Sequence, residues 1–267
     1  MKNRTLTVKS RVVGSSHGVG GHALYLTERD RGVLRYLAQA RWLSTRQVRA
    51  LSFPGVSHSM ACRRLRLLRR ARYVRSVREN SMMEALHTLG VRGREALRDF
   101  GYERRIPQER HPPVNRRHFL GVNDIRIAVL RSVARDGVAL NFFFASWELQ
   151  ERIWPYGMVP DAVCAVEREG KTATAIFEYD RATEGVPYVV DRKFRRYAEG
   201  LDGFGFSHVI TIVESSARRE QLAACTRAKI ADARFSFLMR EELSSWSAER
   251  LLKEGGSRGG SGDGSHV

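Results

Sequence analysis

Two acidic residues at the ends of a predicted hairpin give the clearest indication of chemistry in this sequence. Residues 161–166 and 172–179 have the pattern of two apolar strands, joined by a polar tip at 168–171. If Glu169 and Gly170 form a two-residue loop, the numbers of opposed residues sum to 339, so Asp161 faces Glu178. Opposed side chains have Cβ atoms about 5 Å apart, and like charges in that position are destabilising. The sequence therefore predicts that a further group offsets the repulsion.

A divalent cation is one such group. Asp180 lies two residues after Glu178 and projects to the same face of the strand, so three carboxylates are expected to converge. Carboxylate oxygens are the ligands that Mg²⁺ and Mn²⁺ prefer, and Glu148, after the short apolar run 142–145, is a further candidate ligand. Other interpretations stay open: a bulge shifts the register, or a carboxylate pairs with a nearby arginine or faces water.

The same residues resemble known families. Pro160-Asp161 followed, after a hairpin, by Glu178 is similar to the PD-(D/E)xK nuclease superfamily, although Asp180 stands where that superfamily usually has lysine. A closer resemblance is to the replication-relaxation family of plasmid-associated proteins and mobilisation relaxases. It rests on Pro160-Asp161, on Glu178-x-Asp180-Arg181-x-Thr183-Glu184, on Lys193 and Tyr197 in the next helix, and on an amino-terminal half that looks like that family's winged helix.

The resemblance implies a restriction-endonuclease-like domain, a double-stranded DNA partner such as a plasmid origin, and contacts with replication or conjugation proteins. His118 and Asp124 look like positions that the family uses. From spacing alone, His118 is equally a helix-capping residue and a catalytic one.

Charge is distributed unevenly along the chain. Residues 1–117 carry 26 Lys and Arg against 8 Asp and Glu, whereas residues 118–267 carry 20 against 21. The whole net charge of +17 therefore comes from the first part. A surplus confined to one domain predicts binding to a polyanion, with an affinity that depends strongly on salt.

The basic part has the pattern of a winged helix-turn-helix domain. Capping signals at Thr27, Ser44 and Ser57 start three helices, the third running to about Arg70, and the apolar runs 73–77 and 85–89 predict a wing. The expected DNA contacts are Ser57, His58 and Ser59, mainly to bases, and Arg63, Arg64, Arg66, Arg69 and Arg70, mainly to phosphates.

The chain is long enough for two domains. We expect a flexible basic arm at 1–23, a winged helix-turn-helix domain at 24–100, a linker at 101–117, a nuclease-like domain at 118–254 and a disordered tail at 255–267. In the second domain, helices alternate with apolar runs, which predicts a mixed sheet with helices on both faces. The predicted fold class is therefore α/β (α+β): a winged helix-turn-helix followed by a restriction-endonuclease-like mixed sheet.

The enzyme hypothesis is a DNA nicking or relaxing activity that depends on Mg²⁺ or Mn²⁺. Asp161 and Glu178 would hold the metal, which activates water and neutralises charge on the scissile phosphate. Lys193 is the first candidate for the cation that the missing strand lysine would supply, and Arg181 is the second. Lys193 is equally compatible with being a surface lysine. The rival hypothesis is a non-catalytic DNA-binding replication or transcription regulator with a degenerate nuclease fold, which Asp180 in the lysine position favours.

Other classes of protein fit the sequence less well. No histidine–hydrophobe–histidine pattern is present, which disfavours the metal triad of tyrosine relaxases. Cys62, Cys164 and Cys225 are far apart, so we expect neither a zinc site nor a disulfide framework. The basic start of the chain is followed by no apolar run of the length that a signal peptide needs, and no run of membrane-spanning length occurs, so we expect neither a signal peptide nor a membrane span. A soluble, cytoplasmic protein is expected.

Overall fold

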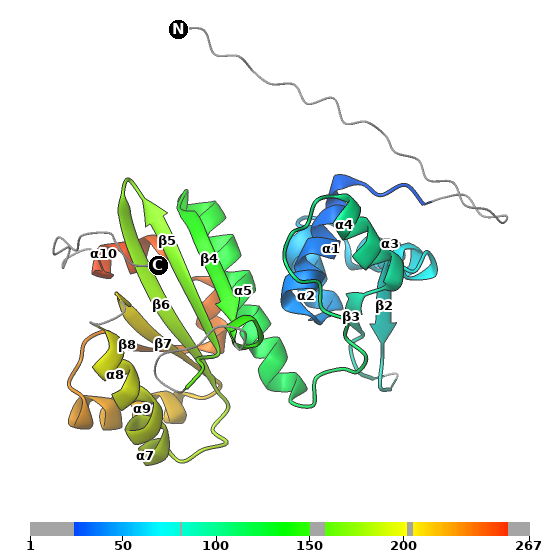
Figure 1. The fold of residues 1–267 in the computed structure, drawn as a ribbon. Coiled ribbons are helices and arrows are strands. Elements are labelled where there is room, and N and C mark those ends of the chain that lie inside the picture. The colour runs from blue at the N-terminus through cyan, green and yellow to red at the C-terminus, as the bar shows by residue number, and fades with distance from the viewer. Residues whose placement is uncertain (1–23, 81, 150–157, 202–204, 256–267) are drawn as a thin grey trace, which may run out of the picture.

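The protein consists of an amino-terminal, mainly helical domain beside a larger domain built on one sheet (Figure 1). The computed structural model describes residues 24–80, 82–149, 158–201 and 205–255. The predicted arm at 1–23 and all of the predicted tail except Gly255 lie outside the described residues.

The amino-terminal domain has the element order of a winged helix-turn-helix. Its elements are α1 (Glu28–Ala40), β1 (Leu43–Ser44), α2 (Thr45–Ser52), α3 (His58–Arg70), β2 (Val74–Val77), β3 (Leu86–Leu89) and α4 (Val91–Asp99). Thr27 and Ser44 form capping boxes with Asp30 and Gln47, as their spacing predicts. The small sheet has the order β1-β3-β2, and the β2–β3 hairpin is the wing.

The second domain is a mixed sheet with helices on both faces. Its elements are α5 (Arg116–Asp136), β4 (Ala139–Ala145), α6 (Ser146–Leu149), β5 (Ala162–Arg168), β6 (Lys171–Asp180), α7 (Val186–Val189), a π-helix η1 (Val190–Phe194), α8 (Arg195–Leu201), β7 (His208–Val213), α9 (Ser216–Lys229), β8 (Phe235–Met239), a 3₁₀-helix η2 (Arg240–Ser244) and α10 (Ala248–Gly255).

The strand order is β4-β5-β6-β7-β8, antiparallel from β4 to β6 and parallel from β6 to β8. Helices α5 and α10 cover one face, with a core that includes Val122, Ile125 and Phe177. Helices α7, α8 and α9 cover the other face (Figure 1), with a core that includes Phe194 and Leu222. The predicted fold class, a winged helix-turn-helix followed by a mixed α/β sheet, is confirmed.

The predicted register of the β5–β6 hairpin is also confirmed. Ala162 pairs with Phe177 and Arg168 with Lys171, so paired numbers sum to 339. Glu169 and Gly170 have φ angles of +53° and +76°, the two positive values that a type I′ turn requires. The irregularity in this part of the sheet lies between β4 and β5, not in the hairpin. The start of β5 and the end of β6 therefore meet at one end of the sheet.

The region predicted as a linker is attached to the wing. Between α4 and α5 the chain has no regular element, yet Arg75 of β2 donates from Nη1 to Arg110 O at 2.8 Å and from Nη2 to Glu109 O at 2.6 Å. Helix α5 begins at Arg116, two residues before the predicted start. None of the described helices has the length and apolar character needed to cross a membrane.

Helix α5 sits unusually close to β6 at Gly121. A Cβ atom at this position would lie 2.3 Å from Cε1 and Cζ of Tyr179, whose ring is buried. Only a residue without a side chain allows this approach, so Gly121 sets the distance between α5 and the sheet.

We predict that Gly121→Ala lowers the free energy of unfolding by roughly 1–3 kcal/mol, because the methyl group must displace a packed ring. Thermal or denaturant unfolding measures this. The matched control is Gly32→Ala in α1, where a Cβ meets nothing within 4 Å. That change should be neutral or stabilising by up to about 1 kcal/mol. Equal effects of the two substitutions would contradict the account of the α5–β6 contact.

Candidate functional site

A pocket of about 230 Å³ lies where β5 begins and β6 ends. Asp161 comes from the residue before β5 and Glu178 from the end of β6. His118 reaches the pocket from the first turn of α5, and Lys193 from the π-helix η1. The structure thus brings together the two acids predicted to be opposed and the lysine predicted to serve them.

Both oxygens of the Asp161 carboxylate have partners. Oδ1 lies 2.9 Å from His118 Nε2, and Oδ2 accepts a hydrogen bond from the backbone N–H of Tyr179 at 2.8 Å. Burial alone would lower the pKa of His118, but the hydrogen bond and the charge of Asp161 outweigh burial and raise that pKa. His118 therefore contacts the site directly, and no side-chain cap is formed at the start of α5.

Glu178 is a buried carboxylate, with 5% of its surface exposed. Tyr197 donates from its hydroxyl to Oε1 at 2.5 Å, and Lys193 Nζ lies 3.4 Å from Oε2. Burial, followed by the negative charge of Asp161, raises the pKa of Glu178 to about 7. The repulsion that the sequence predicts between the two acids is therefore present in the folded protein.

Lys193 is a cation that lies beside Glu178 in the pocket. Its Nζ lies 3.4 Å from both Glu178 Oε2 and Glu184 Oε2. Burial opposes its charge, but Glu178, Asp161 and Glu184 outweigh burial and raise the pKa of Lys193. The segment Val190–Phe194 is π-helical, a local widening that is frequent at functional sites. Lys193 therefore carries a positive charge in this pocket, beside Glu178 and Glu184.

Asp180 lines the same pocket as Asp161 and Glu178, whereas Glu148 lies elsewhere. One oxygen of Asp180 accepts from Arg218 Nε at 3.0 Å and Nη2 at 2.8 Å, while Glu148 bonds to buried Arg126 and to Ala145 N. Among the described residues, no group of three or more His, Cys, Asp and Glu side chains is arranged to hold a metal ion. The predicted convergence of three or four carboxylates is therefore not seen in these side-chain positions, and the metal-ligand roles of the four acids stay predictions. The alternative of an arginine pair applies to Asp180.

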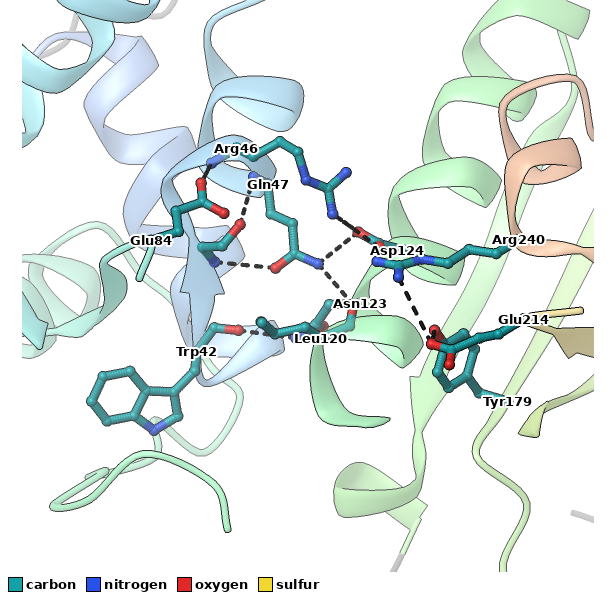
Figure 2. Close-up of polar contacts among 11 residues, drawn as sticks. Trp42, Arg46, Gln47, Glu84, Leu120, Asn123, Asp124, Tyr179, Glu214 and Arg240 are labelled. Carbon is teal, nitrogen blue, oxygen red and sulfur yellow. Dashed lines mark hydrogen bonds and ion pairs between the residues drawn. The ribbon is translucent and has the colours of Figure 1, made fainter. Parts of the chain in front are cut away.

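The remaining residues suggested by the family resemblance divide between two places. Arg181 lines the pocket and donates from Nη1 to Asn115 Oδ1 at 2.7 Å. Asp124 lies outside the pocket, in contact with the amino-terminal domain and with Arg240 (Figure 2). Arg218 was not predicted, because it lies 38 residues from Asp180 and only the packing of α9 on the sheet brings them together.

The third helix of the amino-terminal domain presents four exposed arginines, Arg63, Arg66, Arg69 and Arg70. None of the four forms an ion pair within the part of the chain that the structure describes. Arg64 differs, because its Nε donates to Oδ1 of the fully buried Asp30 at 2.9 Å and its Nη2 to Tyr25 O at 2.9 Å. The guanidinium group of Arg64 therefore ties α3 to the start of α1, and its assignment to DNA stays a prediction.

The amino end of α3 is exposed, as expected of a base-contacting segment. Ser57 caps the helix through Met60 N, and its Oγ lies 3.2 Å from Ser59 Oγ. His58 Nε2 lies 3.3 Å from Cys62 Sγ one turn later. The assignment of these residues to bases stays a prediction.

A groove of about 450 Å³ separates α3 from the wing. Arg66 and Arg69 line it from α3, and Arg78 lines it from the wing. His87 lies beneath, between Thr45 Oγ1 at 2.9 Å and Ser76 Oγ at 2.8 Å. Burial, with the charges of Arg69 and Arg78, lowers the pKa of His87 to about 4, so it is neutral at pH 7. Arg78 was not predicted from the sequence, because a single arginine in a turn does not indicate which groove its side chain lines.

Comparison with known proteins identifies one family. Residues 34–203 match the family model described as replication-relaxation. No curated protein matches the sequence. The chain has a weak likeness to the structure of restriction endonuclease FokI, with 12% identity and a TM-score of 0.33, covering 87% of this chain and 48% of that one. This chain thus spans about half the length of that structure, and a similarity this small says nothing further about fold or activity.

The contrast between the arginines of α3 gives a testable prediction. Replacing Arg66 and Arg69 together by Ala should weaken binding to a labelled DNA duplex and reduce the slope of log affinity against log salt by about 2. Arg64→Ala should instead lower the free energy of unfolding by about 2 kcal/mol, because Asp30 loses its charged partner. Fluorescence anisotropy and denaturant unfolding separate the two effects. An Arg66/Arg69 variant with wild-type salt dependence would contradict the assignment.

The raised pKa of Glu178 predicts how stability depends on pH. The folded protein holds this proton more tightly than the unfolded chain, whose reference pKa is 4.5. The stabilisation is therefore complete below about pH 4.5 and is lost as pH rises through about 7, a change of roughly 3 kcal/mol.

With divalent cations removed by EDTA, Glu178→Gln should match the wild type at low pH and be more stable above pH 7. Asp161→Asn should lower the pKa of Glu178, measured by NMR of the labelled carboxyl carbon. Asp180→Asn is the control, because its charge is already paired with Arg218. An unchanged pKa in Asp161→Asn would show that the two acids do not interact.

Proposed function

This chain belongs to the replication-relaxation family, and we propose that it binds double-stranded DNA through its amino-terminal domain and cuts one strand in the Asp161–Glu178 pocket. The observation that carries the proposal is the pair of acids beside Lys193 at one end of the sheet. Buried like charges persist in proteins mainly where function requires them, which makes strongly shifted groups in a pocket candidates for catalysis.

The two acids fit a magnesium or manganese ion. Mg²⁺ is usually held by one or two carboxylates, with water and substrate phosphate oxygens completing its ligands. Asp161 and Glu178 supply that number, and a cation between them would offset the burial and the charge of Asp161 that raise the pKa of Glu178 to about 7. Such an ion would supply activation of water and neutralisation of charge on the phosphate. Asp180 and Glu148 are not needed.

The surrounding residues have separate roles in this proposal. His118 holds one oxygen of Asp161, and the Tyr179 backbone holds the other, so the carboxylate has a fixed orientation. Tyr197 fixes one oxygen of Glu178. Lys193 places a positive charge at the pocket, where it can pair with a phosphate oxygen of the DNA instead of with Glu178.

The groove between α3 and the wing supplies the DNA contact. Its arginines come from both sides, and the neutral His87 beneath them adds no charge. The family description supports a role in replication, so the proposed substrate is a plasmid origin in the cytoplasm, reached with replication or conjugation proteins. Strand nicking at such a site would relax supercoiled DNA.

One observation favours a second candidate function. Lys193 pairs with Glu178 and Arg218 with Asp180, so two of the three hairpin acids have a cationic partner from this chain. A protein in which these pairs are permanent would bind DNA without cutting it. It would then act as a replication or transcription regulator.

The two functions are separated by incubating the protein with supercoiled plasmid and Mg²⁺ or Mn²⁺. We expect the wild type to produce nicked circles. Asp161→Ala and Glu178→Ala should cut at least about 100-fold more slowly, because even the loss of an outer-shell partner of a metal ligand costs roughly 10–100-fold. Lys193→Ala should lower the rate less severely, because the metal remains bound.

The matched control is Glu167→Gln, a change to an acid at the opposite end of the same hairpin, which should cut like the wild type. Cleavage that survives in Asp161→Ala and Glu178→Ala would place the activity elsewhere. Retained DNA binding with no cleavage under any condition would establish the regulator instead.

A further inference from the structure

The two domains are joined by hydrogen bonds from buried side chains. Asn123 of α5 is fully buried and donates from Nδ2 to Trp42 O at 2.9 Å and to Ala40 O at 3.3 Å. Gln47 of α2 is also fully buried and donates from Nε2 to Leu120 O at 2.8 Å (Figure 2). Separating the domains would exchange these hydrogen bonds for bonds to water, at a net cost of about 0.5–1.5 kcal/mol for each bond.

Asp124 extends this joint by one residue. Its carboxylate accepts from Arg46 Nη2 at 2.9 and 3.0 Å and from Gln47 Nε2 at 2.7 Å. Arg240 of η2 donates to the same carboxylate at 2.7 Å. One acid therefore binds three donors that come from both domains, as Figure 2 shows.

A second set of contacts lies beside the first. Trp147 Nε1 donates to Gln39 O at 3.1 Å, and Arg41 Nη2 donates back to Trp147 O at 3.3 Å. Further along α5, Arg131 donates to Ala50 O at 3.1 Å. The contacts of α5 with α1, α2 and the segment between them thus run from Leu120 to Arg131, about three turns of one helix.

The same helix reaches the wing and the pocket. Arg116, at its first residue, donates from Nη2 to Glu84 O at 2.7 Å and lies 3.3 Å from Glu79 in the wing. His118, two residues later, contacts Asp161. A single helix therefore touches the wing, the interdomain joint and the candidate active site.

We propose that α5 and this joint form a rigid spacer, so that DNA held by α3 and the wing meets the Asp161–Glu178 pocket at one fixed distance from the sequence that is read. Domains joined by small polar interfaces usually move relative to each other. Here the buried donors of Asn123 and Gln47 and the shared carboxylate of Asp124 oppose such motion. The inference rests on the proposed function only for its DNA substrate. The rigidity of the spacer is a property of the protein alone and can be measured without DNA.

The test is a distance measurement by electron paramagnetic resonance. Spin-labelled non-natural amino acids replace Arg98 in α4 and Ala228 in α9, both of which are exposed. The full chain should give one narrow distance distribution, which is unchanged by supercoiled plasmid DNA. Combining Arg46→Ala with Asn123→Ala should replace the narrow peak by a broad distribution.

The matched control is Arg49→Ala, also on α2, whose exposed side chain has no polar contact among the described residues, and which should keep the narrow peak. Arg46→Ala alone provides a milder variant if the double variant unfolds, and it should widen the peak. A broad distribution in the wild type, or the same narrow peak in the variants that retain the fold, would overturn the spacer.

Mapping the nick on the same plasmid against the protected sequence completes the test. The wild type should cut at one position relative to that sequence, and the joint variants at several. A narrow distance without any cutting would reject the nuclease and keep the spacer. Cutting at scattered positions by the wild type would keep the nuclease and reject the spacer.

Discussion

Two carboxylates of like charge, Asp161 and Glu178, are held at the same end of one sheet. The residues around them form hydrogen bonds that offset the cost of burying the two acids together. The hairpin register brings them together, and burial with mutual repulsion raises the pKa of Glu178 to about 7. His118, the Tyr179 backbone, Tyr197 and Lys193 each satisfy one carboxylate oxygen. Burying charge without such partners would be prohibitive. Each of the four carboxylate oxygens therefore has a hydrogen-bonding partner, while burial still raises the pKa of Glu178.

Helix α5 connects this pocket to the rest of the molecule. Gly121 lets the helix approach Tyr179, which places His118 over Asp161. The next residues of the helix accept or donate the bonds that fix the amino-terminal domain. One helix thus sets both the geometry of the acids and the position of the arginine-rich groove relative to them. Substitutions in α5 are expected to affect DNA binding and the pocket together.

Local features of this structure could be predicted from the sequence, and long-range partners could not. Thr27, Ser44 and Ser57 start helices because their side chains accept from backbone N–H groups a turn away, and Glu169-Gly170 fixes the hairpin register through its two positive φ angles. By contrast, Arg218 reaches Asp180, and Arg64 reaches Asp30, only because separate helices pack together. The strand period correctly places Asp180 on the face of Glu178, but it carries no information about which cation lies there. The π-helical turn at Lys193 likewise depends on packing.

We propose that Asp161 and Glu178 share a divalent cation when the protein cuts DNA. Anomalous diffraction from crystals grown with Mn²⁺ and a DNA duplex tests this directly. We expect a manganese peak in contact with both carboxylates, with Lys193 moved from Glu178 to a phosphate oxygen. Crystals with Mn²⁺ and bound DNA in which no peak contacts these acids, and in which Lys193 still pairs with Glu178, would contradict it.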